Sequence, residues 1–223
     1  MATALDDAST VHRLVTVPAD AGAWFVRRVD RDVLQIGLGE LIELLGGAAD
    51  AAARGSRERF SVHRVARGTT LVHESAHAQT LYIVQSGSFK SVKTAEDGYE
   101  HVLAFAWRRD VIGYGGLYRE HYAFGAVALE DSRVIALPMA ALAALRQQSP
   151  ALDAALQALV ARQLAHAGEI AEVMSAVAAD ARLARFLVQL SARMAECGQS
   201  PRRLLLRMNR RDIANHLGLA HET

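Results

Sequence analysis

The spacing of apolar residues changes near Pro138, and this change constrains the fold more than any other feature of the chain. Between Phe60 and Pro138, apolar and polar residues alternate in short runs that glycine or polar residues separate. Such runs are typical of antiparallel strands with one buried face. Beyond Pro138 the alternation stops, and alanine, leucine, arginine and glutamine dominate. The sequence therefore predicts an α+β protein, with a small antiparallel barrel or roll followed by helices.

The strands of this β-region are short and are joined by tight turns. Gly68 and Gly87 lie in two of these turns, and Asp97 and Gly98 lie in a third. The segment Lys93–His101 is predicted to be a hairpin, because Asp97 and Gly98 tolerate the positive φ that its tip needs. The predicted strands are Ser61–Val65, Thr69–His73, Thr80–Ser86, Ser88–Thr94, His101–Trp107, Gly125–Leu129 and Arg133–Leu137.

A long helix is predicted from Pro150 to about Val177. Proline is tolerated in the first helical turn, and Ser149 is a suitable N-cap. The helix carries two rows of apolar residues, and one row is enough to pack against the β-region. We expect the other surface to meet the same helix of a second copy in a homodimer, although both rows can also face one core. The predicted interface is Leu156, Leu159, Gln163, His166, Ile170, Val173 and Val177; the second row is Leu156, Val160, Leu164, Ala167, Ala171 and Met174.

Shorter helices are predicted on either side of these elements. Val33–Leu45 has apolar residues at helical spacing, and residues 48–59 either extend that helix or form a connector. Ala181–Cys197 is predicted to be a helix that Gly198 terminates.

The overall charge hides one local cluster. Lys plus Arg number 25 and Asp plus Glu number 24, so the formal net charge is only +1. The segment Arg202–Arg211, however, holds arginine at five positions and no acidic residue. Such a cluster is typical of a surface that contacts nucleic acid, and its simpler interpretation is a solvated loop. The arginines are Arg202, Arg203, Arg207, Arg210 and Arg211.

The residues that follow the cluster have the pattern of a helix-turn-helix. Asn209 is a candidate N-cap for a helix whose Ile213 and Leu217 face inward, and Gly218 permits the turn. A second helix is expected from Ala220. In a helix-turn-helix, the second helix enters the DNA major groove and basic side chains around the first helix contact phosphates.

Taken together, these motifs resemble the CRP/FNR family of bacterial transcription regulators, and most closely its FNR branch. The likeness extends over about residues 60 to 223. In the helical part it is carried by Arg182–Leu187, Ser200–Arg202, Arg210–Leu219 and Glu222-Thr223. In the β-region it is carried by Gly68–Leu71, Leu81–Gly87, Asp97-Gly98 and Asp110–Gly113.

The resemblance implies a domain plan for the chain. Residues 1–59 form an N-terminal helical or irregular segment, and 60–138 form a β-roll like a cyclic-nucleotide-binding domain. Residues 139–179 hold the dimerisation helix, and 180–223 form a winged helix-turn-helix domain that is incomplete. In the family the recognition helix continues beyond the Glu-Thr pair, so this chain is expected to be truncated at Thr223 and to bind DNA poorly as it stands.

Two departures from the family bear on the effector. Members that respond to cyclic AMP hold the ribose and phosphate with a Gly-Glu and an Arg-Ser pair. Here Tyr114 follows Gly113, and Tyr122-Ala123 stand where the Arg-Ser pair is expected. Without that guanidinium, cyclic AMP is not expected to bind. The effector-pocket candidates are Gly113, Tyr114, Gly115, Tyr122 and Ala123.

The cofactor is not identified by the sequence. FNR proteins bind a 4Fe–4S cluster with N-terminal cysteines, but the only cysteine here is Cys197. This cysteine can make neither an internal disulfide nor a cysteine-built metal site, so no such cluster is expected. Its place near the arginines suggests a lowered pKa, although a small apolar filler is the commoner role. Haem is a less favoured interpretation, with candidate ligands His12, His63, His73, His77, His101 and His121.

The resemblance predicts a homodimeric DNA-binding transcription regulator that couples an effector signal in the β-roll to operator binding. Its expected partners are palindromic operator DNA, a second copy of itself, an unknown small-molecule effector and, by analogy, RNA polymerase. The alternative is a nucleotide- or haem-binding module without DNA-binding activity. No enzyme motif, membrane span or signal peptide is recognised, so a non-enzymatic cytoplasmic protein is expected. The predicted DNA-binding residues are Asn209, Arg210, Arg211, His221, Glu222 and Thr223.

Overall fold

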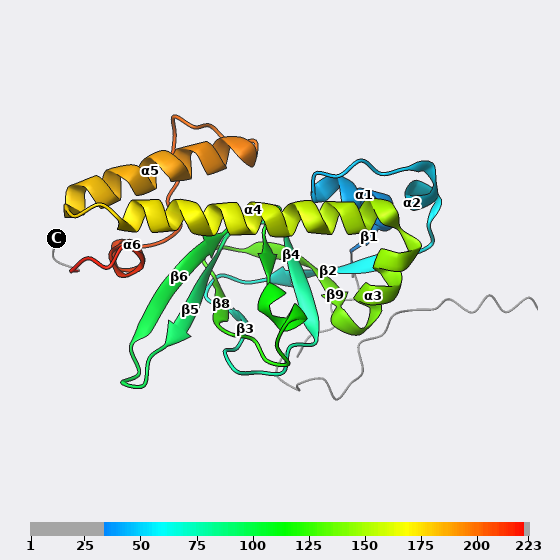
Figure 1. Ribbon diagram of the computed structural model, residues 1–223, viewed down its shortest axis with the longest axis horizontal. Coiled ribbons are helices and arrows are strands. Elements are labelled where there is room, and N and C mark those ends of the chain that lie inside the picture. Colours follow the sequence, from blue (N-terminus) through cyan, green and yellow to red (C-terminus); the bar gives the residue numbers. More distant parts are fainter. Residues whose placement is uncertain (1–33, 221–223) are drawn as a thin grey trace, which may run out of the picture.

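The computed structural model describes residues 34–220 and has strands before Pro138 and helices after it (Figure 1). The strands form two antiparallel sheets, one of order β1-β2-β9-β4-β7 and one of order β3-β8-β5-β6. The predicted α+β class with a β-roll is therefore confirmed. The strands are β1 Gln35–Gly37, β2 Arg59–Val65, β3 Thr70–Val72, β4 Thr80–Ser86, β5 Phe89–Thr94, β6 Glu100–Ala106, β7 Val111–Ile112, β8 Gly125–Ala128 and β9 Ser132–Pro138.

All the predicted strands of the β-region are present to within a residue or two. The sequence did not reveal β7, because its two residues are too short to show alternation. The turn glycines behave as expected, and Gly68, Gly87 and Gly98 all have positive φ. At Gly87 an added Cβ would lie 2.1 Å from the Oγ of Ser132, so this position also requires a residue without a side chain.

The N-terminal prediction was wrong in part. In place of one helix over Val33–Leu45, the chain forms strand β1 and then helix α1 (Leu38–Leu44). Ile36 pairs with Phe60 of β2, so the apolar residues before Gly37 pack as a strand rather than as a helical face. The undecided stretch that follows contains a separate short helix, α2 (Ala51–Gly55), whose N-cap Asp50 accepts a hydrogen bond from the amide of Ala53.

Four further α-helices and one 3₁₀ turn complete the described chain. Helix α4 begins at Pro150, as predicted, and the Oγ of Ser149 accepts a hydrogen bond from the Leu152 amide. It lies across the β-roll, and α5 runs beside it on the outer side (Figure 1). No helix of the described residues is both long and apolar enough to cross a membrane. The elements are η1 Tyr114–Leu117, α3 Met139–Gln148, α4 Pro150–Met174, α5 Ala179–Glu196 and α6 Arg210–His216.

The two apolar rows of α4 lie in different environments. Of the row predicted to form the dimer interface, Leu156, Leu159 and Val173 are buried against their own chain, and Gln163 donates a hydrogen bond to the Val111 carbonyl. Val177 lies beyond the end of α4 and is 95% exposed. In the second row, Leu164 is 75% exposed. The second row, with Val160, Leu164 and Met174, therefore presents the more exposed apolar surface.

Candidate functional site

The first helix of the predicted helix-turn-helix is present and begins as expected. Asn209 caps α6: its side chain accepts a hydrogen bond from the Asp212 amide at 2.7 Å, and the Asp212 carboxylate accepts one from the Asn209 amide. Gly218 follows the helix with a φ of 62°. Arg210 and Arg211 are exposed in the first turn. The other predicted DNA-binding residues, His221, Glu222 and Thr223, lie outside the described residues.

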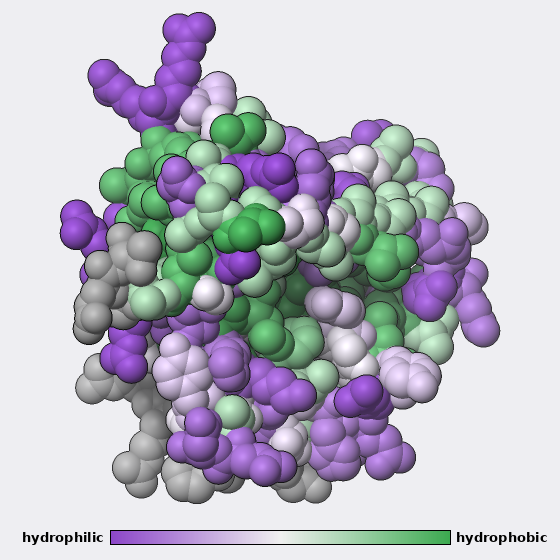
Figure 2. Space-filling view, turned by 60° about the vertical axis from the view of Figure 1, so that its left-hand side comes forward, coloured by the Kyte–Doolittle hydropathy of each residue, from purple (hydrophilic) through white to green (hydrophobic). Residues whose placement is uncertain are grey.

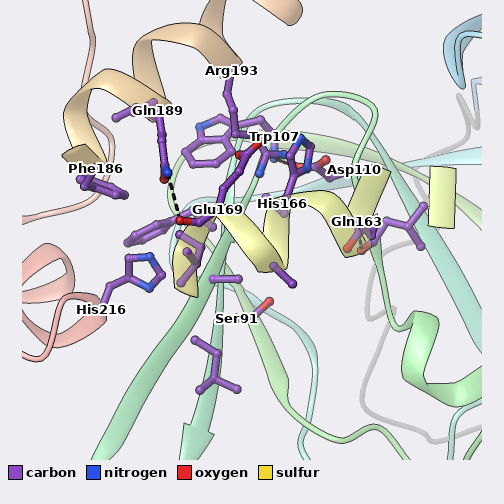
Figure 3. A pocket seen from close by; sticks show the side chains of 18 of the residues that line it. Ser91, Trp107, Asp110, Gln163, His166, Glu169, Phe186, Gln189, Arg193 and His216 are labelled. Atoms are coloured by element: carbon purple, nitrogen blue, oxygen red, sulfur yellow. Dashed lines mark hydrogen bonds and ion pairs between the residues drawn. The ribbon is translucent and has the colours of Figure 1, made fainter. Parts of the chain in front are cut away.

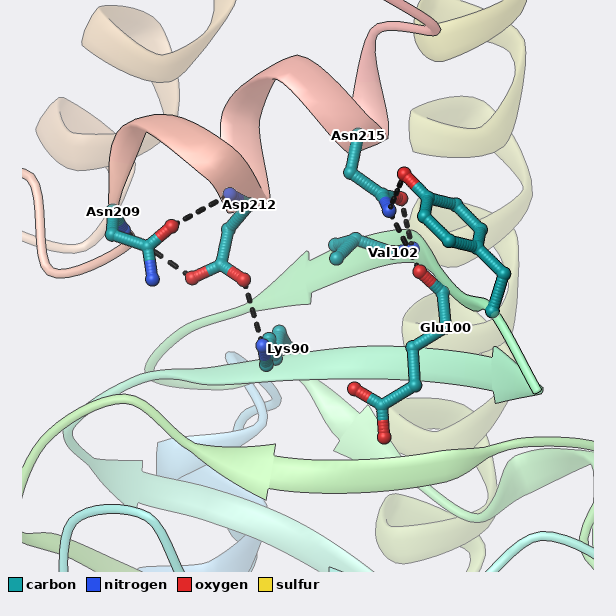
Figure 4. A network of polar contacts seen from close by, with 7 residues as sticks. Lys90, Glu100, Val102, Asn209, Asp212 and Asn215 are labelled. Atoms are coloured by element: carbon teal, nitrogen blue, oxygen red, sulfur yellow. Dashed lines mark hydrogen bonds and ion pairs between the residues drawn. The ribbon is translucent and has the colours of Figure 1, made fainter. Parts of the chain in front are cut away.

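Helix α6 is docked on the free edge of β6 (Figure 4). The side-chain oxygen of Asn215 accepts a hydrogen bond from the Val102 amide, and its nitrogen donates to the Glu100 carbonyl, both at 2.7 Å. The same nitrogen donates to the Tyr99 hydroxyl at 2.9 Å. One amide side chain therefore satisfies backbone groups that an edge strand would otherwise present to water.

An ion pair anchors the other end of the same helix. Nζ of Lys90, on β5, lies 2.7 Å from Oδ1 of Asp212, and the two side chains are only 19% and 8% exposed. Asp212 thus serves both the cap of α6 and the contact with the roll. A third contact, between Arg207 and Glu130 at 2.9 Å, ties the arginine segment to the roll.

The docked helices share an apolar core with the roll. Phe186 of α5 and Leu217 pack in one cluster with Phe105 of β6. The imidazole of His216 lies edge-on to Phe105 and Phe186, and its Nδ1 is 3.1 Å from the Val102 carbonyl. Burial lowers the pKa of His216, which favours the neutral form of the ring. Its buried Nε2 has no hydrogen-bond partner among the described residues.

A second ion pair, which is mostly buried, joins α5 to the turn that follows β6. Nη2 of Arg193 lies 2.6 Å from Oδ2 of Asp110, and the guanidinium lies 5.0 Å from the centre of the Trp107 ring. Burial raises the pKa of Asp110 despite the opposing effect of Arg193. Cys197 is half-buried nearby, and burial raises its thiol pKa, with Asp110 adding to the rise. The suggestion of a lowered pKa for Cys197 was therefore wrong, because desolvation outweighs the nearby arginine.

A cavity of about 340 Å³ opens between these elements. Its wall is formed by β6, the second half of α4, α5 and His216 of α6, and Figure 3 shows side chains from all of them directed toward it. Figure 2 shows apolar residues gathered around a hollow on this side of the molecule. The cavity thus touches both the β-roll and α6, the helix that carries Arg210 and Arg211.

The effector-pocket candidates form one cluster, but only part of it faces the cavity. Tyr114 lines the cavity and is 40% exposed. Tyr122 is instead buried in the roll, where its hydroxyl donates to the Thr80 carbonyl at 2.7 Å and accepts from the Thr80 amide at 3.2 Å. Gly113 has a φ of 88°, and an added Cβ there would lie 2.8 Å from the Tyr122 ring. Gly115 lies in η1, and Ala123 follows Tyr122.

The comparisons with known proteins agree with this architecture. The family model of the cyclic nucleotide-binding domain matches residues 62–149. The chain is 32% identical over 160 residues to the transcriptional regulatory protein btr of Bordetella pertussis, covering 72% of this chain and 66% of that one. It is 33% identical over 159 residues to the fumarate and nitrate reduction regulatory protein of Escherichia coli K12, covering 71% and 64%. The chain belongs to the CRP/FNR family. It spans slightly less than two thirds of the length of these relatives.

Solved structures share the fold. FixK2 from Bradyrhizobium japonicum matches with a TM-score of 0.57 and 23% identity, over 73% of this chain and 79% of that one. A CRP-family transcriptional regulator from Thermus thermophilus matches with a TM-score of 0.59 and 23% identity, over 72% and 78%. At this identity the likeness concerns the fold.

The histidines considered as haem ligands are scattered in this CRP/FNR chain. His77 and His121 face each other across an isolated bridge, with ring centres 5.7 Å apart. His63 is partly buried, which lowers its pKa, whereas His73 and His101 are exposed. His12 lies outside the described residues. Within residues 34–220, no group of three or more His, Cys, Asp or Glu side chains is placed to hold a metal ion.

Sequence reasoning missed the residues that dock α6. Lys90 and Asp212 are 122 positions apart, and Val102 and Asn215 are 113 apart. No local pattern connects such pairs. The one available signal was Asp212 at the third position of α6, which predicts a capping box but not its partner on β5.

Proposed function

We propose that this CRP/FNR protein is a DNA-binding transcription regulator that acts as a homodimer. The observation that carries the proposal is α6, a capped helix followed by a glycine turn, which presents Arg210 and Arg211 to solvent. Exposed guanidinium groups in the first turn of such a helix are suited to DNA phosphates. The regulatory relatives in Bordetella and Escherichia support the same function.

Operator binding tests this proposal directly. Sites should be selected from random duplexes with the full natural chain, and affinity measured across a salt series. If the arginines contact phosphates, Arg210→Ala and Arg211→Ala each weaken binding to all sequences and make the slope of log K against log salt less steep by about one. Arg146→Ala, on α3 and far from α6 in the chain, is the matched control. Absence of any sequence-selective binding by the full chain would overturn the proposal in favour of a binding module without DNA activity.

We place the dimer contact on the second row of α4. Val160, Leu164 and Met174 are exposed along one helix, and a second copy of the same helix offers a complementary apolar surface across a two-fold axis. Leu164→Glu is expected to convert dimers to monomers in sedimentation velocity, whereas Ala154→Glu, also exposed on α4, leaves them intact. An unchanged sedimentation coefficient for Leu164→Glu would contradict this interface.

The effector of the regulator is proposed not to be cyclic AMP. The cyclic phosphate needs a guanidinium, but Tyr122 stands at the expected position and its hydroxyl is engaged by Thr80. Calorimetric titration with cyclic AMP is expected to show no saturable heat. A micromolar Kd would contradict this part of the proposal.

By analogy with the family, we also propose that the exposed tip of the β5–β6 hairpin contacts RNA polymerase.

A further inference from the structure

The cavity between the roll, α4 and α5 has walls that disfavour anions. Among the described residues that line it, the only cationic side chain is Arg193, and that guanidinium is already paired with Asp110 and placed over Trp107. Glu169 adds a second carboxylate to the wall. His166 also lines the cavity, and burial lowers its pKa, so it is mostly neutral at pH 7. A phosphate or carboxylate entering the cavity would meet no unpaired positive charge on this described wall.

The same walls favour a flat apolar molecule. Aromatic rings from separate elements border the space: Phe105 and Trp107 at β6, Phe124 before β8 and Phe186 on α5. A volume of about 340 Å³ lies within the range of small-molecule sites. Rings that surround a cavity in this way stack on a planar ligand and replace its contacts with water.

The cavity wall also holds one unused polar group. His216 is only 7% exposed, and its Nδ1 donates to the Val102 carbonyl. Its Nε2 is then an acceptor, and it has no partner among the described residues. A buried acceptor of this kind is costly unless it is paired. Figure 3 shows the imidazole reaching from α6 toward the other cavity side chains. An N–H or O–H group on a ligand would supply the missing donor.

We propose that this cavity binds an uncharged, flat aromatic molecule with one N–H or O–H group, and that such a molecule is the effector. The binding site follows from the cavity walls alone, whereas the word effector rests on the proposed function. A ligand placed here touches β6, α4, α5 and His216 at once. It therefore contacts both the roll and the helices that position Arg210 and Arg211. Ligand binding and release are expected to change how α6 docks on β6.

Two dyes with the same ring skeleton test the chemistry. N-phenyl-1-naphthylamine is neutral and carries one N–H group, and 8-anilino-1-naphthalenesulfonate adds a negative charge to that skeleton. Fluorescence titration of the full chain is expected to show one neutral dye bound per chain and at least ten-fold weaker binding of the sulfonate. Equal affinities for the two dyes, or no saturable binding of the neutral dye, would overturn the proposal.

Variants locate the dye in the cavity. Ala104→Phe fills the space from β6 and should weaken the neutral dye at least ten-fold, whereas Ala154→Phe, exposed on α4 outside the cavity, should not. Glu169→Lys, which is expected to fold even if Ala104→Phe does not, should shift the preference between the dyes at least ten-fold toward the sulfonate. Dye affinities unchanged by Ala104→Phe and Glu169→Lys would place the dye elsewhere and overturn the proposal. None of these readouts uses DNA, so their failure is distinct from a failure to bind an operator.

Discussion

Two contacts of the roll with its helices are built from different chemistry. Where α1 and the first half of α4 pack on the first sheet, the central side chains are aliphatic and fully buried, among them Leu41, Ile135 and Leu152. Where α6 meets the second sheet, apolar side chains share the contact with directional hydrogen bonds and a mostly buried ion pair. Aliphatic burial contributes most of the free energy of folding, whereas directional polar contacts fix one orientation and exchange readily for water. The second contact is therefore the better suited to open and close.

The largest effect is expected in the aliphatic core. Leu152→Ala removes a fully buried side chain and should lower the free energy of unfolding by about 2–5 kcal/mol, because it leaves a cavity among close-packed neighbours. Urea denaturation measures this change. Leu205→Ala, at a residue that is 66% exposed, is the control and should change stability by less than about 0.5 kcal/mol. Similar losses for the two variants would mean that Leu152 does not anchor α4.

A smaller and more local effect is expected at the α6 contact. Asn215→Ala leaves the Val102 amide without its acceptor, which should cost about 1–3 kcal/mol. Amide hydrogen exchange is expected to speed up in α6 and at Val102 while the core strands keep their protection. Gln157→Ala, which breaks one exposed contact with Asp153, is the control. Uniformly faster exchange throughout the chain would show that the two contacts open together.

Acidification should loosen the α6 contact more than the core. Burial lowers the pKa of His216 in the folded state, so protonation favours the undocked state. The docked state therefore loses stability as pH falls below about 6.5, by at most about 1.4 kcal/mol per pH unit. His63 and His166 shift in the same direction and add to the global loss. Hydrogen exchange of the α6 amides, measured from pH 7.5 to 5.5, tests this prediction. His216→Phe should remove the part of the pH dependence that is local to α6. An unchanged pH profile of α6 exchange in that variant would contradict the role of His216.

The strands and the long helix were predictable because their signals are local. Alternation located β4 to the residue, and Ser149-Pro150 located the start of α4. The start of α1 was not predictable, because Ile36 fits either a helical face or a strand, and only its pairing with Phe60 decides. The candidate site was predictable only in part for the same reason. Asn209 and Gly218 indicate the start and the end of the first helix of the helix-turn-helix. The partners of Asp212 and Asn215, however, lie more than a hundred residues away in the sequence.

The smallest effect is expected inside the roll, at Tyr122. Tyr122→Phe removes the hydrogen bonds with the amide and carbonyl of Thr80 but keeps the ring that packs beside Gly113. The loss of free energy of unfolding should be about 1 kcal/mol, because one neutral hydroxyl is removed while the packing remains. Tyr122→Arg, which introduces the guanidinium that cyclic AMP would need, should cost more because the charge would enter a buried site. Urea denaturation of both variants orders the two costs. If Tyr122→Arg were as stable as Tyr122→Phe, the roll would have room for a charged group at this position. The interior of the roll would then be open to an effector, as we propose for the cavity at α5.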